Sequence, residues 1–147
     1  MLAITLAAPG VALTVATMLL LLGLPFGIDP LWHVEPLTLP EAAALRDNGE
    51  IMRLIDRGAD PNRAGTVRAN FLHNDPLVVT PLEAAVGADR TDVVEVLIDN
   101  GATIDATTWT RLVCFAAAIE ADDARSFLEQ RRPAGASDDC GQVDIPW

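Results

Sequence analysis

The chain has 147 residues, a length that suits one domain, and a formal charge of −11 from 21 acidic and 10 basic side chains. An acidic surface excludes a general nucleic-acid-binding role, because nucleic-acid recognition needs a basic footprint. Aromatic residues make up only 5% of the chain and tyrosine is absent. Any folded core must therefore be built mainly from small aliphatic side chains.

Residues 1–28 carry no charged side chain. Leu2 to Leu24 consist mainly of leucine, alanine, valine and threonine, and a membrane span needs about 20 apolar residues. We therefore predict a single-pass transmembrane anchor at residues 1–28. The alternative is a cleaved signal peptide, but the segment lacks a basic start, and no small-x-small cleavage site follows its leucine run.

The orientation of this anchor is not set by flanking charges. Lysine and arginine near the ends of a span normally decide its orientation, yet the first arginine is Arg46, far beyond Leu24. Cys114 and Cys140 are the two cysteines of the chain, and a disulfide between them would require an oxidising compartment. The alternative is one buried and one free thiol. We expect the domain on the exported side, periplasmic or extracellular, with the cytoplasmic face as the alternative.

Residues 29–37 are predicted to be a linker. Pro30 and Pro36 restrict the residues before them to extended or turn backbone. Trp32 suits the interface between membrane and water. His33 has no second metal-ligand residue beside it, so we expect a solvated side chain and no metal site.

The stretch from Thr80 to Asp105 predicts two short helices joined by a turn. Thr80 is a good N-cap, Pro81 suits the first helical position, and Glu83 completes the pattern of a capping box. Gly101 is expected to end the second helix in a left-handed conformation. The second helix carries its apolar residues on one face, at spacings of three and four: Val93, Val94, Leu97 and Ile98.

Two further segments repeat this plan. Thr38 to Asn62 contains a second capping box, Thr38 with Glu41, and a closing glycine at Gly58. A weaker third copy, from Leu112 to Glu129, has an alanine-rich first helix and lacks the Thr-Pro-Leu start. Helices this short are not stable alone in water, so the copies are expected to stack on one another.

The order Thr-Pro-Leu, two short helices and a closing Gly-Ala resembles the ankyrin repeat, whose signature is T-P-L-H-x-A in a unit of about 33 residues. The resemblance implies an all-α solenoid of three helix-turn-helix repeats that binds a protein partner. Glu83 stands where the family has histidine, which puts the hydrogen bonding of that histidine in question. The implied boundaries are 38–62 for repeat 1, 63–79 for a long finger loop, 80–105 for repeat 2, 106–130 for repeat 3 or cap, and 131–147 for a C-terminal tail.

The finger loop at residues 63–79 makes the spacing between the first two copies about ten residues longer than the family unit. In ankyrin repeats this position is the β-hairpin finger, and long connections often carry function. The loop is locally basic and aromatic, so we predict that it contacts a partner. The alternative is that Phe71 and Leu72 fold back and cover the first two repeats. The predicted contact residues are Arg63, Arg68, Phe71, Leu72 and His73.

Trp109 falls in residues 106–111, which are expected to form the next finger. Because tryptophan is common at binding hot spots, Trp109 is also a candidate partner contact, but we favour the alternative, a core plug under the loop. The tail at residues 131–147 is predicted to dock its apolar end on the third repeat, held by a Cys114–Cys140 disulfide. The alternative is a short linear motif for another protein.

The sequence contains no recognisable catalytic or metal-binding set. Its two histidines lie far apart, and His-Glu-x-x-His, Cys-x-x-Cys and glycine-rich phosphate-loop motifs are absent. We expect no enzymatic activity, cofactor or small-molecule substrate. The predicted function is that of a membrane-tethered adaptor or scaffold for an unidentified protein client. The alternatives are an inhibitory or protective partner of one membrane or exported client, and a thiol-redox protein using Cys114 and Cys140.

Overall fold

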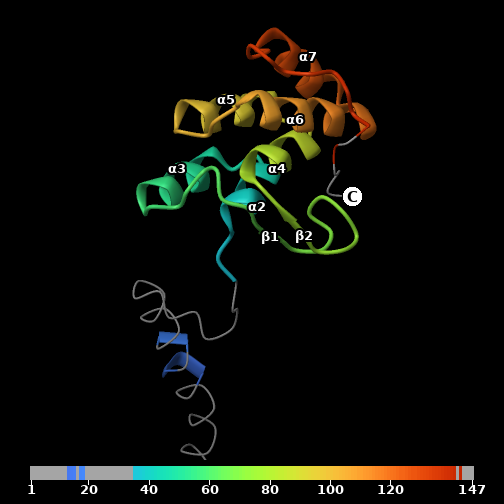
Figure 1. The fold of residues 1–147 in the computed structure, drawn as a ribbon. Coiled ribbons are helices and arrows are strands. Elements are labelled where there is room, and N and C mark those ends of the chain that lie inside the picture. The colour runs from blue at the N-terminus through green and yellow to red at the C-terminus, as the bar shows by residue number, and fades with distance from the viewer. Residues whose placement is uncertain (1–12, 16, 19–34, 142, 144–147) are drawn as a thin grey trace, which may run out of the picture. The chain divides into compact units, whose positions relative to one another are not determined.

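The computed structural model describes residues 13–15, 17–18, 35–141 and 143. The chain divides into two compact units, Met1–Pro36 and Leu37–Trp147. The second unit is mostly helical (Figure 1). Its elements in chain order are α2 (Leu39–Ala44), α3 (Asn48–Asp56), β1 (Gly65–Val67), β2 (Leu77–Val79), α4 (Pro81–Gly87), α5 (Thr91–Asp99), α6 (Ala106–Ala118) and α7 (Asp122–Gln130).

In the first unit, residues 13–15 and 17–18 are helical, and the Thr17 hydroxyl donates to the Leu13 carbonyl at 2.8 Å. No helix in the part of the chain that the structure describes has the length and apolar character needed to cross a membrane. The predicted anchor, residues 1–28, lies mostly outside the described residues, as does most of the 29–37 linker, and the structure gives the anchor no support.

Three helix pairs of the second unit share the same turn. A residue with positive φ precedes each second helix: Arg46 at 60°, Asp89 at 53° and Glu120 at 59°. Residues other than glycine rarely adopt this conformation, so its recurrence at one position is informative. The helices that follow, α3, α5 and α7, all have 9 residues. The pairs α2–α3, α4–α5 and α6–α7 are thus three copies of one helix-turn-helix unit.

Both predicted capping boxes are present. In α2 the Thr38 amide donates to the Glu41 carboxylate at 3.0 Å, and the Glu41 amide donates to the Thr38 hydroxyl at 3.4 Å. In α4 the Thr80 amide and hydroxyl donate to Oε2 of Glu83 at 2.7 and 2.8 Å. The carboxylate of Glu83 therefore supplies the hydrogen bonding in the turn that the missing histidine had put in question.

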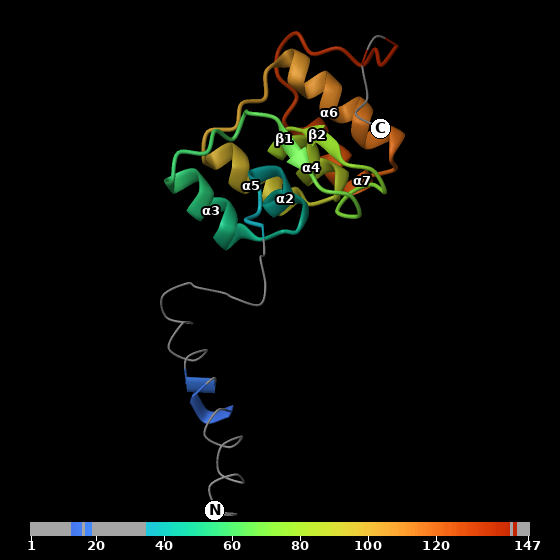
Figure 2. The ribbon, with the colours of Figure 1, turned by 90° about the horizontal axis from the view of Figure 1, so that it is seen from below.

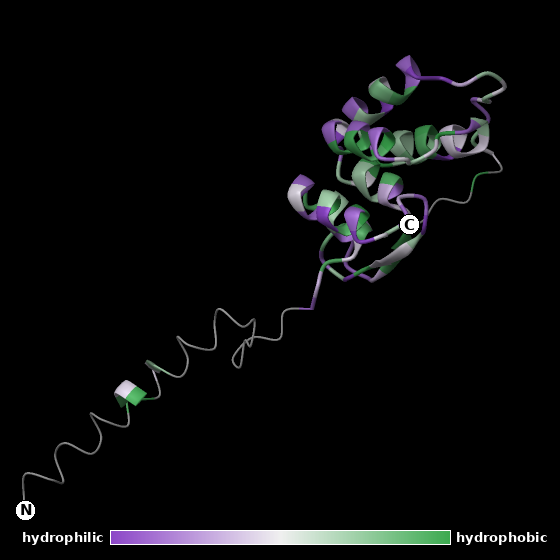
Figure 3. Ribbon diagram, turned by 90° about the vertical axis from the view of Figure 1, so that its left-hand side faces the viewer, coloured by the Kyte–Doolittle hydropathy of each residue, from purple (hydrophilic) through white to green (hydrophobic). Residues whose placement is uncertain are grey.

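The repeats stack in chain order, with α2 packed on α4, α4 on α6 and α5 on α7 (Figures 1 and 2). Hydrophobic and hydrophilic residues lie side by side within the helices, as expected for helices buried on one face (Figure 3). Ile51 of α3 and Val94 of α5 are fully buried and belong to one hydrophobic cluster. The first two repeats therefore share one hydrophobic core, as expected if the copies stack on one another.

Cross-repeat hydrogen bonds add to this packing. The Asn62 side chain donates to the Gly101 carbonyl at 3.0 Å and accepts from the Thr103 amide at 2.8 Å. The Ala124 amide donates to the Asp89 carboxylate at 2.8 Å. These bonds join the ends of neighbouring repeats, so each repeat is fixed against the next by polar contacts as well as by burial.

The long finger contains a two-stranded antiparallel sheet, so the fold is not entirely α-helical. In the register of β1 and β2, Gly65 faces Val79 and Val67 faces Leu77. Val67 and Val79 are buried, whereas Val78 is 70% exposed, as the alternation of side chains along a strand requires. The hairpin thus packs one face on the repeats and presents Val78 on the other.

The start of the third repeat differs from the prediction. Residues 106–111, expected to form a finger, are the first turns of α6, which begins at Ala106. The Asp105 carboxylate caps this helix by accepting from the Thr108 amide at 2.7 Å. The third repeat lacks the Thr-Pro-Leu start of the other copies, so its first helix was predicted to begin later. Aspartate caps a helix as well as threonine does and needs no proline after it.

The tail is attached to α6. Cys114 of α6 and Cys140 form a disulfide with a Cα–Cα distance of 5.5 Å and a sequence separation of 26. The Thr110 hydroxyl donates to the Ser137 carbonyl at 3.0 Å, and the Ser137 amide lies 3.2 Å from the same hydroxyl. The disulfide is present as predicted, and it holds the described part of the tail on α6 of the third repeat. Most of the apolar end that was predicted to dock, residues 144–147, lies outside the described residues.

Candidate functional site

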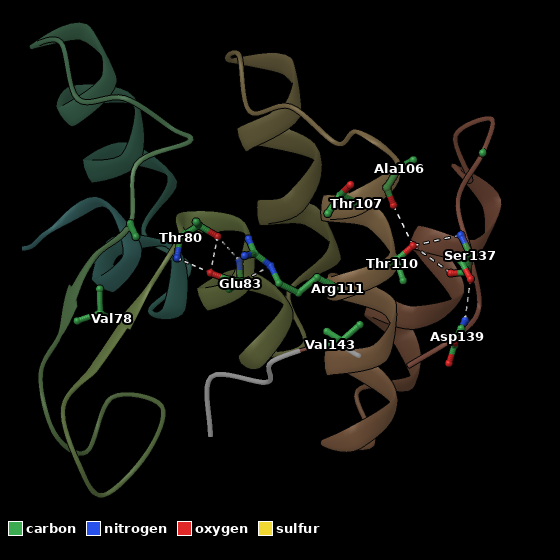
Figure 4. Close-up of a pocket in the computed structure, with 12 residues that line it drawn as sticks. Val78, Thr80, Glu83, Ala106, Thr107, Thr110, Arg111, Ser137, Asp139 and Val143 are labelled. Carbon is green, nitrogen blue, oxygen red and sulfur yellow. Dashed lines mark hydrogen bonds and ion pairs between the residues drawn. The ribbon is translucent and has the colours of Figure 1, made fainter. Parts of the chain in front are cut away.

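A groove of about 660 Å³ is bounded by the hairpin, the first helices of repeats 2 and 3, and the tail (Figure 4). A volume of this size is in the usual range for ligand sites in proteins. The polar and charged lining residues are Thr80, Glu83, Thr107, Thr110, Arg111, Ser137 and Asp139; the others are Ala64, Val78, Ala106, Gly135 and Val143.

The groove brings together side chains from the hairpin, the start of α4, α6 and the tail. Val78 comes from the exposed face of β2, while Thr80 and Glu83 come from the capped start of α4. Thr107 and Arg111 are one helical turn apart on α6, so both can face the same side. Exposed apolar surface therefore lies on one wall, and the helices supply polar and charged groups.

The central charged pair of the groove is Glu83 with Arg111, whose side chains point toward one another in Figure 4. Nε of Arg111 lies 3.0 Å from Oε1 of Glu83. The two groups form an ion pair, but Nε is buried without a hydrogen-bond partner among the described residues. The Glu83 side chain is 7% exposed and that of Arg111 is 41% exposed, so Arg111 is the more accessible member of the pair.

The first repeat contains the corresponding pair in a complete form. Oε1 of Glu41 accepts from Nε of Arg68 at 2.6 Å and from the Arg68 amide at 3.0 Å, and Oε2 accepts from Nη2 at 3.0 Å. Burial of Glu41 by itself raises the pKa of this carboxyl, but the bonds from Arg68 and Thr38 outweigh burial and leave the pKa below its usual value. Glu41 is therefore ionised and fully bonded within the domain.

The tail wall of the groove is held in place by the disulfide and by hydrogen bonds. Ser137 is bonded to Thr110 of α6 (Figure 4), and the Asp139 amide donates to the Ser137 hydroxyl at 3.0 Å. Arg132 forms an ion pair with Asp138 at 2.9 Å. This wall exists only because residues distant in sequence return to α6.

The predicted finger residues lie outside the lining of this groove. Arg68 is bonded to Glu41 and stacks on Phe71 with 5.1 Å to the ring centroid. Phe71 and Leu72 are half-buried and pack against the core, as expected under the fold-back alternative. Arg63 and His73 are exposed at the surface. Arg68, Phe71 and Leu72 therefore make their contacts within the domain, and the exposed His73 accepts at Nδ1 from the Asp75 amide at 3.2 Å.

Trp109 is 1% exposed, and its Nε1 donates to the Leu128 carbonyl at 2.7 Å. The Arg132 guanidinium lies over its ring at 5.1 Å. This arrangement corresponds to the core-plug alternative and leaves the ring no surface for a partner. Indole N–H groups are normally satisfied when buried, and here the ring joins α6 to α7.

Sequence reasoning did not select the residues that line the groove. The available signal was the separation of Glu83 from Arg111, which nearly equals that of Glu41 from Arg68. Ser137 and Asp139 carry no comparable signal, because the disulfide and the Thr110 contact bring them to the groove. Among the described residues, no group of His, Cys, Asp and Glu side chains is arranged to hold a metal ion.

Comparison with known families identifies one repeat. The family described as Ankyrin repeat matches residues 79–109, from the end of β2 through α4 and α5 into α6. This interval is therefore an ankyrin repeat, and such repeats indicate a protein-interaction module. No curated protein and no solved structure gives a significant match to the chain.

Proposed function

We propose that this chain is a non-catalytic adaptor that binds a protein client in the groove between β2, α4, α6 and the tail. The observation that carries the proposal is the position of the groove: it lies on the face built by the finger and by first helices, and its residues include part of the ankyrin repeat at 79–109. Exposed Val78 offers apolar contact, and the hydroxyl and charged groups opposite it offer hydrogen bonds.

The proposal includes a membrane tether at residues 1–28, supported by the uncharged, leucine-rich composition of that segment. It also places the repeats on the exported side, because disulfides such as Cys114–Cys140 persist in oxidising compartments. A tether raises the local concentration of the adaptor near clients in the same membrane. Protease treatment of sealed vesicles tests the side: digestion of the repeats only from the exported face is expected.

Cross-linking in native membranes followed by mass spectrometry tests client binding. Val78→Arg and Thr107→Arg place a bulky cation in the groove at exposed positions, so both should abolish capture of the cross-linked neighbour. Met52→Arg is the matched control, since Met52 is exposed on α3 and is not among the groove residues. It should leave capture unchanged.

The thermal unfolding of all three variants establishes that they are folded before capture is compared. Capture that survives both groove substitutions would reject the groove as the binding site. Capture lost equally in the Met52→Arg control would show that the loss is not specific to the groove, and would likewise contradict the proposal.

The tether is tested by deleting residues 1–28, which should move the protein out of the membrane fraction. Retention of the shortened protein in that fraction would contradict the tether.

A further inference from the structure

We propose that Arg111 recognises a carboxylate on the client, with Glu83 as a positioning residue that holds the guanidinium at the groove. The ligand class is a peptide segment that presents an acidic side chain. This inference rests on the proposed binding function and names the chemistry of one subsite within it.

The first argument is the geometry of the guanidinium. Arginine has five N–H donors in a fixed planar fork, and its two edges can each face a carboxylate. On one edge of the Arg111 guanidinium, the buried Nε lies 3.0 Å from Oε1 of Glu83. Among the described residues Arg111 has no other ion-pair partner and makes no aligned hydrogen bond, although it lines the groove. The terminal nitrogens are therefore free to bind a second carboxylate.

The second argument is the contrast with repeat 1. Glu41 and Arg68 form the same type of pair, but Arg68 donates three hydrogen bonds to the carboxylate. The hydrogen bonding between Glu41 and Arg68 is therefore complete without a ligand. In repeat 2 the Glu83 carboxylate accepts hydrogen bonds from the Thr80 amide and hydroxyl. Its only contact with Arg111 is the ion pair at Nε. In the Glu83–Arg111 pair beside the groove, the guanidinium therefore still lacks an aligned hydrogen-bond acceptor among the described residues. This is the arrangement expected if a ligand supplies that acceptor.

Charge in the groove sets a limit on this interaction. Asp139 lines the same groove and is exposed, so it opposes the approach of a carboxylate. The net charge of the chain is −11, but at physiological salt the Debye length is about 8 Å, so distant acidic groups are largely screened. The contact therefore depends on the nearby donors of Arg111, and removing the Asp139 charge should strengthen it.

The test is an NMR titration of the full-length chain in detergent micelles with the disulfide intact. The probes are two blocked pentapeptides, Ac-Ala-Ala-Glu-Ala-Ala-NH2 and its isosteric Gln counterpart. The readout is the side-chain Nε–Hε signal of Arg111, assigned by its absence in Arg111→Lys, with the Arg68 signal as internal reference. The Glu peptide should shift the Arg111 signal saturably and the Arg68 signal not at all.

The Gln peptide should bind about tenfold more weakly or worse, because it loses the charge-assisted hydrogen bonds. Arg111→Lys keeps the charge but loses the fork, and should weaken the Glu peptide to a similar extent, as followed by backbone amide shifts of the groove. Asp139→Asn should tighten the Glu peptide by about twofold. Equal binding of the two peptides to the unmodified chain would overturn the proposal without reference to any variant.

Failure of this subsite is distinguishable from failure of the proposed function. If Val78→Arg abolishes client capture but the Glu and Gln peptides bind alike, the groove remains the client site and Arg111 does not recognise carboxylates. If the groove substitutions leave client capture unchanged and the Glu and Gln peptides bind equally well, both proposals are wrong.

Discussion

At the scale of single residues, two buried glutamates, Glu41 and Glu83, each cap a helix and also contact an arginine distant in sequence. A buried carboxylate is costly unless it is paired and hydrogen-bonded. Glu41 is 1% exposed and accepts bonds from Thr38 and from Arg68, which lies in the finger. The same residue thus caps α2 and fixes the hairpin on the first repeat. Its role joins local helix capping to long-range structure.

The ionisation of Glu41 should make the free energy of unfolding of the domain decrease as the pH falls. The folded pKa of this carboxyl is lowered, so its contribution is fully present above the unfolded value of about 4.3 and disappears as the pH falls through the folded pKa. Glu41→Gln should reduce stability near neutral pH and flatten this acid dependence. Urea unfolding between about pH 3 and about pH 6 measures both effects.

Arg68→Met is the counterpart to that measurement. It leaves Glu41 buried without its cation, which raises the carboxyl pKa, so the variant should gain stability as the pH falls. The loss near neutral pH should be about 2 kcal/mol, below the cost at a fully buried pair, because the Arg68 side chain is 38% exposed. The same acid slope in both variants would contradict the assigned role of the pair.

At the scale of elements, the short helices depend on their caps. Thr80 is bonded to Glu83 through both its amide and its hydroxyl. Thr80→Ala removes the hydroxyl and should lower the free energy of unfolding by about 1 kcal/mol, whereas Thr80→Ser should be nearly neutral because it keeps the cap. Equilibrium urea unfolding compares the two. A Ser variant as unstable as the Ala variant would mean that the methyl packing of Thr80, and not its cap, matters.

Such local signals explain which parts of the fold could be predicted from sequence. The capping boxes and the left-handed Gly101, with φ of 99°, follow from residue types and spacing at the ends of single helices. They also match what the family resemblance implies. All of them depend on residues only a few positions apart, where helical geometry decides the outcome.

The candidate site could not be predicted in the same way, because it depends on contacts between distant residues. Arg68 was assigned to a partner since the finger is locally basic, but its acceptor is Glu41 in the preceding repeat. Trp109 was placed in a finger because Asp105 was not recognised as a cap. Arg111 becomes a groove residue only when α6 stacks on α4 and brings it to Glu83.

At the scale of the whole folded unit, stability comes from the interfaces between repeats. Besides apolar burial, exposed ion pairs link neighbours: Arg46 with Asp92 at 2.7 Å and Arg131 with Glu95 at 2.9 Å. Exposed pairs of this type contribute little individually. Units that contact only their neighbours are stable when the sum of interface terms is sufficient, and the last repeat has a neighbour on one side among the described residues. The tail supplies a further contact there, through the disulfide.

The Cys114–Cys140 bond should therefore matter most for the third repeat and the groove. Closing a loop with a sequence separation of 26 is expected to stabilise the folded chain by about 3.5 kcal/mol through the entropy of the unfolded state. The double variant Cys114→Ser, Cys140→Ser should lose roughly that amount in urea unfolding. Hydrogen exchange should rise first in the tail and α7, with α2 and α4 protected longest. Uniform loss of protection across all three repeats would show instead that the stack unfolds as one unit and that the bond stabilises the whole of it.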